Sequence, residues 1–221
     1  MSSRSHIRGS LAAAMCLVFS GAFFILYPAI RPFSDEVTLA GARAFASSAW
    51  VLAHLLAVVG FILLVLGIFG LWSRLRGTPA GGVLLRALVI CWVGIGLTLP
   101  FYGAEVFGLH AIGQQAVDQG DVALVALAND VRTGPGLPVF ALGLLTLAAG
   151  SIMVAVGVWR ARIAGRWGGI ALAVGFSLFI PQFFAGQMIR VLHGVIIAVG
   201  CVSLAAYLLR PPGRTEGVGN T

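Results

Sequence analysis

The chain has 221 residues, of which 59% are hydrophobic and only 10% are charged. A soluble globular domain carries about 25% charged residues, so this composition excludes an ordinary soluble domain and predicts an integral membrane protein. The net charge is +7, but the arginines that carry it stand between apolar segments and form no basic run. The expected partner is therefore the lipid bilayer and not a nucleic acid.

Six apolar segments follow a short cytoplasmic lead, residues 1–9. Each is long enough to cross a hydrocarbon core of about 30 Å as an α-helix. They comprise residues 11–30, 49–72, 84–109, 137–159, 167–184 and 188–209. The sequence thus predicts an all-α integral membrane protein, a six-transmembrane-helix bundle over residues 10–209. Residues 210–221 are rich in proline and glycine and are expected to form a disordered cytoplasmic tail.

The longest connection between these segments is the loop of residues 110–136. Asp121 can cap a short helix that runs to Val131, because the stretch between them is rich in alanine, leucine and valine and residues 133–136 end it. Such a helix is too short to span a membrane. We therefore predict a short interfacial helix in this outer loop.

The distribution of arginines predicts the orientation. The side of the bundle that carries both termini holds ten of the fourteen arginines, and the other side holds Arg31, Arg43, Arg132 and Arg190. Cytoplasmic loops are enriched in basic residues. The sequence therefore predicts a multi-pass protein of the cell membrane with both termini in the cytoplasm.

Glycines recur every seven residues along the fourth apolar segment, at Gly136, Gly143, Gly150 and Gly157. This spacing places them on one side of a helix, where the missing side chains let another helix approach closely. We expect this glycine seam to be a helix–helix contact and a candidate surface for a homo-oligomer.

One acidic residue, Glu105, lies in or directly against an apolar segment, where a carboxylate is costly. Further polar residues and many aromatic ones fall at the same outer end of the bundle, which favours an outward-facing pocket for a small lipophilic molecule. Glu105 and His110 are the catalytic candidates, because carboxyl and imidazole groups suit acid–base chemistry. The ligand-binding candidates are His54, Tyr102, Gln182, Gln187, Arg190 and His193.

Two other interpretations stay open. His54 and His193 fall at similar depths on two segments and suit the axial ligands of a b-type haem. Alternatively, the polar residues only cap helices and reach water, in a structural or assembly subunit without catalytic activity. Metal-dependent hydrolysis at Glu105, His110, His54 and His193 is a weaker alternative, since no HExxH motif is present; no metal site is predicted, and whether the histidines bind haem or a metal stays open. The sequence leaves open whether the protein is an enzyme.

Overall fold

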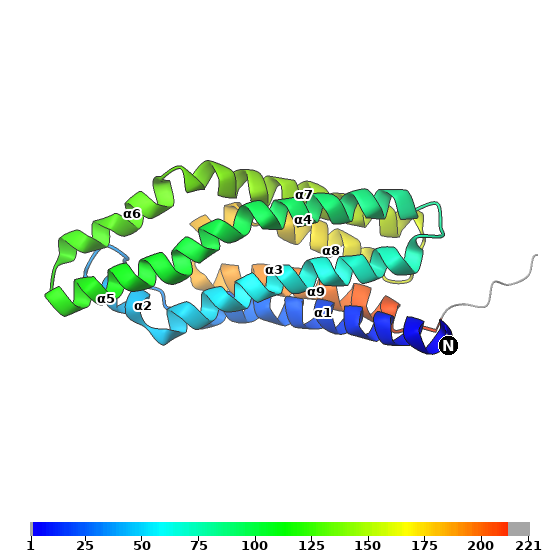
Figure 1. The fold of residues 1–221 in the computed structure, drawn as a ribbon, viewed down its shortest axis with the longest axis horizontal. Helices are drawn as coiled ribbons and strands as arrows, with labels where there is room; N and C mark the ends of the chain where they lie inside the picture. Colours follow the sequence, from blue (N-terminus) through cyan, green and yellow to red (C-terminus); the bar gives the residue numbers. More distant parts are fainter. Residues whose placement is uncertain (1, 212–221) are drawn as a thin grey trace, which may run out of the picture.

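The computed structural model describes residues 2–211, and this part of the chain is helical, without a strand. Its long helices lie side by side in an elongated bundle (Figure 1). Five helical segments are long and apolar enough to cross a membrane. They belong to α1 (Ser2–Ile30), α3 (Ser48–Leu75), α4 (Gly81–Gly103), α7 (Gly136–Arg160) and α9 (Gln187–Leu208). The predicted tail, 210–221, lies almost wholly outside the described residues.

The expected span 167–184 is not among these five. Its helix, α8 (Arg166–Ser177), has 12 residues and is followed by the 3₁₀ turn η3 (Pro181–Phe184). At about 1.5 Å per residue, α8 is only about 18 Å long. Pro181 has no N–H to donate to the carbonyl of Ser177, which helps to end the α-helix there. The count of six spans therefore stays a prediction.

The third predicted span continues well past its expected end at residue 109. α4 runs through a π-helical turn, η1 (Ala104–Gly108), into α5 (Leu109–Gln119), so that the helical segment Gly81–Gln119 has 39 residues. It ends at Gly120, whose φ of 66° is in the left-handed region that glycine adopts easily. The expectation of a loop from residue 110 was wrong, because Leu109, Gly113 and Ala116 form a buried face that holds this stretch in a helix.

Short helices form a helical cap at the end of the bundle away from the N-terminus (Figure 1). The helical cap consists of α2 (Leu39–Ala46), α5, η2 (Val122–Val125) and α6 (Ala126–Thr133). It has a separate core built from Ala42, Phe45, Trp50, Leu109, Ala116, Val125 and Ala128. Asp121 caps η2 by accepting a hydrogen bond from the N–H of Ala123 at 2.8 Å. The position of this region at a membrane surface stays a prediction.

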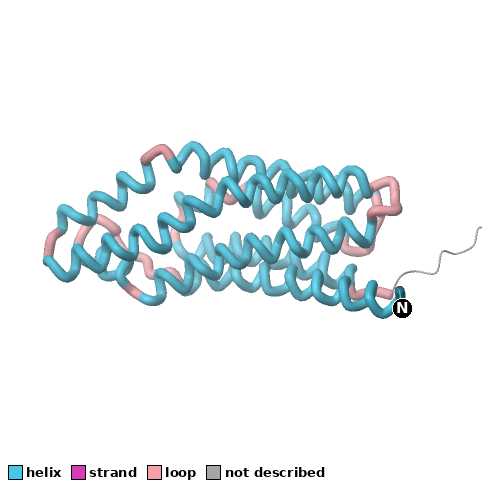
Figure 2. The backbone as a smooth tube through the Cα atoms, viewed as in Figure 1, coloured by secondary structure: helices cyan, strands magenta, loops and turns pink. Residues whose placement is uncertain are grey.

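The glycine seam of α7 packs against α4, which lies beside it (Figure 2). A Cβ atom on Gly143 would lie 2.6 Å from Oγ1 of Thr98 and 2.9 Å from the carbonyl oxygen of Gly94. One on Gly150 would lie 2.9 Å from the backbone nitrogen of Cys91. The seam is thus a close helix contact, but it is filled within the chain. A contact with a second copy through these glycines stays a prediction.

Candidate functional site

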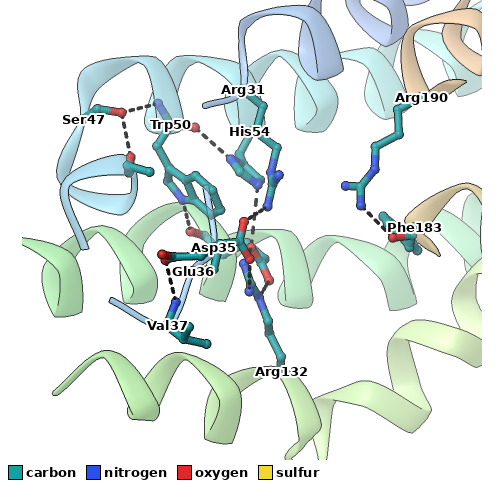
Figure 3. A network of polar contacts seen from close by, with 12 residues as sticks. Arg31, Asp35, Glu36, Val37, Ser47, Trp50, His54, Arg132, Phe183 and Arg190 are labelled. Atoms are coloured by element: carbon teal, nitrogen blue, oxygen red, sulfur yellow. Dashed lines mark hydrogen bonds and ion pairs between the residues drawn. The ribbon is translucent and has the colours of Figure 1, made fainter. Parts of the chain in front are cut away.

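A chain of alternating charges joins the bundle to the helical cap (Figure 3). Arg132 of α6 binds both carboxylate oxygens of Glu105, with Nε–Oε1 at 2.6 Å and Nη2–Oε2 at 3.1 Å. It also donates to Glu36 at 2.5 Å, and the other oxygen of Glu36 accepts from Arg31 at 2.6 Å. We call these four residues, Arg31, Glu36, Arg132 and Glu105, the charged network. Arg31 and Glu36 are close in sequence, whereas Arg132 lies 96 residues from Glu36 and 27 from Glu105, so the charged network forms only when the cap folds onto the bundle.

The π-helical turn η1 and Trp50 together position Glu105. A π turn widens the helix by one residue, and such turns are frequent at functional sites. The indole N–H of Trp50 donates to the carbonyl oxygen of Glu105 at 2.7 Å, which satisfies a polar group of the turn. Glu105 is 9% exposed, and the partner that its buried carboxylate needs is Arg132.

Glu36 reaches the network from an unusual backbone conformation. Its φ of 57° is in the left-handed region, which non-glycine residues rarely adopt. Gly41 leaves room for this loop, because a Cβ there would lie 2.5 Å from Cα of Glu36. Burial raises the pKa of the Glu36 carboxyl, but the charges of Arg31 and Arg132 outweigh it and hold that pKa below its usual 4.5. Glu36 is therefore a charged partner at neutral pH.

His54 of α3 faces the network with one ring nitrogen. Its Nδ1 lies 2.8 Å from the carbonyl oxygen of Trp50, which can only accept a hydrogen bond. We therefore assign the proton of the neutral ring to Nδ1, which leaves Nε2 as an acceptor. Nε2 lies 3.7 Å from Oε2 of Glu105, too far for a direct hydrogen bond.

A cavity of about 360 Å³ opens beside the charged network. The network residues, His54, Tyr102 and Arg190 give it a polar wall. The rest of the lining is mainly apolar and comes from α4, α7 and the η3 region, including Phe101, Phe140, Leu144, Ile180, Phe183 and Phe184. The buried hydroxyl of Tyr102 makes no hydrogen bond of good geometry among the described residues, although the side chain of Tyr27, which also lines the cavity, lies near it. Leaving such a group unsatisfied costs about 1–3 kcal/mol.

Four predicted site residues line this cavity: His54, Tyr102, Glu105 and Arg190. The sequence reasoning missed Arg31, Glu36 and Arg132, which line it too. The only sign of these three residues in the sequence was that they are charged and lie in connections at the arginine-poor end of the bundle. This indicates the correct end of the molecule but does not identify which residue pairs with Glu105.

The other four predicted residues do not line the cavity. His110 lies on the helical cap, where its Nδ1 is 2.9 Å from the carbonyl oxygen of Phe45. Gln187 donates to the carbonyl of Pro28 at 3.2 Å, and the Nε2 of His193 lies 2.7 Å from the carbonyl oxygen of Gly175. Gln182 is buried within η3. The three side chains with hydrogen bonds hold helix ends together, which is a packing role.

A haem between His54 and His193 stays a prediction. In each ring, one nitrogen already pairs with a backbone carbonyl. Among the described residues there is no group of three or more histidine, cysteine, aspartate or glutamate side chains arranged to hold a metal ion.

No protein-family model, curated protein or solved structure matches this chain. The evidence for its function is therefore the geometry of the cavity and of the charged network.

Proposed function

We propose that this chain is a multi-pass protein of the cell membrane whose cavity binds a small lipophilic molecule. One observation carries the proposal: a cavity of about 360 Å³ is lined by aromatic and aliphatic side chains together with charged and polar ones. Ligand sites are typically concave and mostly apolar, with a few polar groups that fix orientation. The buried hydroxyl of Tyr102, next to Tyr27, adds a polar group that a ligand is able to satisfy.

The distribution of arginines supports an outward-facing cavity. The helical cap and the charged network lie at the arginine-poor end of the bundle (Figure 1). By the positive-inside rule, such an end is expected outside the cytoplasm. In this proposal both termini are cytoplasmic, and the ligand enters from the outer leaflet or the outer solution.

Acid–base chemistry on the ligand is the second candidate, and the unengaged Nε2 of His54 favours it. His54 and Glu105 both line the cavity, with this nitrogen 3.7 Å from Oε2 of Glu105, whereas His110 does not line it. His54→Asn retains a donor for the Trp50 carbonyl and removes Nε2. If the protein converts its ligand, the molecule that copurifies with His54→Asn will differ in mass from that bound to the parent. An unchanged mass would support ligand binding without conversion.

Binding is tested with a small neutral fluorophore such as 1-aminoanthracene, on protein in phosphatidylcholine nanodiscs. Ala141 lines the cavity, whereas Ala149 lies on the exposed face of the same helix. We expect saturable binding to the parent and to Ala149→Trp, and its loss in Ala141→Trp, which fills the cavity. Binding that is absent from the parent, or equal in the two variants, would refute the proposal and favour the assembly-subunit interpretation.

A further inference from the structure

The charges that line the cavity do not balance. Three arginines and two glutamates face it, so with His54 uncharged the cavity has one positive charge in excess. Both glutamates are already engaged within the charged network, where their four carboxylate oxygens accept hydrogen bonds from Arg31 and Arg132. The excess charge therefore belongs to the remaining cation, Arg190.

Arg190 has no carboxylate partner among the described residues. Its guanidinium donates to two backbone carbonyls, with Nε 2.9 Å from the oxygen of Ala185 and Nη2 2.6 Å from that of Phe183. Figure 3 shows it apart from the charged network, directed toward Phe183. A guanidinium carries five N–H donors, so several remain for another acceptor.

Arg190 and Arg31 both lie over one aromatic ring. Their guanidinium carbons lie 5.1 and 4.9 Å from the centroid of Phe33, and both residues line the cavity. The two guanidinium groups are therefore within about 10 Å of each other, so an anion bound to Arg190 is also attracted by Arg31. The planar fork of arginine matches the oxygens of a carboxylate or a phosphate.

The apolar wall continues to the outer surface of the bundle. Phe184 and Leu137 line the cavity and are also 90% and 42% exposed. An apolar chain lying along this wall is therefore able to leave the cavity toward the lipid.

We infer that the ligand of this cavity is an amphiphile with a single anionic head, a carboxylate or a phosphate. The head binds to Arg190 and Arg31, and the apolar chain lies against the wall of α7 and η3. This inference rests on the proposed function, since it names the class of ligand for the same cavity.

The test is displacement of 1-aminoanthracene from the protein in phosphatidylcholine nanodiscs by dodecanoate and by dodecanol. These molecules share a chain and differ in the charge of the head. We expect dodecanoate to displace the fluorophore at a concentration at least tenfold lower than dodecanol. Arg190→Gln should remove this preference, and Arg43→Gln, at an exposed arginine of the cap, should retain it.

Equal displacement by the two molecules from the parent would overturn this inference and leave the lipophilic pocket standing. A parent that binds no fluorophore would overturn the proposed function as well. The comparison within the parent decides the question even if Arg190→Gln fails to fold. Repeating it in discs that contain phosphatidylglycerol separates the sources of the anion. If dodecanoate no longer binds in the phosphatidylglycerol discs, the anionic head of the ligand belongs to a membrane lipid. If its binding is unchanged, the ligand is a free acid.

Discussion

The contact between Arg132 and Glu105 predicts a measurable coupling energy. It consists of two charged hydrogen bonds between side chains that are 26% and 11% exposed. Removing one partner of a buried ion pair costs about 3–5 kcal/mol, because the other charge is left unpaired. Arg132 is partly exposed, so we expect Arg132→Met to lower the free energy of unfolding by about 3 kcal/mol and Glu105→Gln by about 2 kcal/mol.

The double variant should lose only about 3 kcal/mol, because each single change already breaks the shared contact, which gives a coupling of about 2 kcal/mol. The assay is unfolding followed by circular dichroism while a denaturing detergent is added to mixed micelles. Arg43→Met, at an exposed cap arginine, controls for loss of a positive charge and should change little. A coupling energy below about 0.5 kcal/mol would refute the reasoning, since the two side chains would then act independently.

Three further predictions concern the network and the packing around it. The arginines beside Glu36 hold its pKa below 4.5, so its contribution to stability is complete above about pH 5 and is lost as the pH falls. The melting temperature of the parent should therefore fall more than that of Glu36→Gln between pH 6 and 3.5, and parallel curves would contradict this. Gly143→Ala should lower the free energy of unfolding by about 1–3 kcal/mol, because its Cβ meets the backbone of α4. Gly96→Ala should leave that free energy unchanged, because its Cβ meets nothing within 4 Å. Trp50→Phe should lower the free energy of unfolding by about 2–3 kcal/mol, because the indole hydrogen bond is lost. Trp167→Phe, at an exposed position, should change it little. Both are measured by unfolding in mixed micelles.

Features set by local composition were predicted from the sequence. Five long helices coincide with predicted apolar segments, since a stretch of that length and hydropathy has few alternatives. The seven-residue glycine spacing predicted a close helix contact, which the structure shows between α7 and α4. The cost of a carboxylate in an apolar setting pointed to Glu105, which does line the cavity.

Features that depend on tertiary contacts were not predicted. α2 and α5 are short and amphipathic, and their buried residues become apparent only when they pack on one another. Arg132 lies 27 residues from Glu105, so the pair exists only after the cap has folded. The π turn that positions Glu105 has no sequence signal of its own. The hydrogen bonds of Gln187 and His193 to distant carbonyls, such as that of Gly175, could not be read from the sequence either.

Native mass spectrometry of the gently purified protein tests the central claim most directly. The account predicts a parent that carries one bound small molecule, which is retained in Ala149→Trp and absent from Ala141→Trp. A parent that has only the mass of its own chain, or a bound mass that persists when Ala141→Trp fills the cavity, would contradict the account.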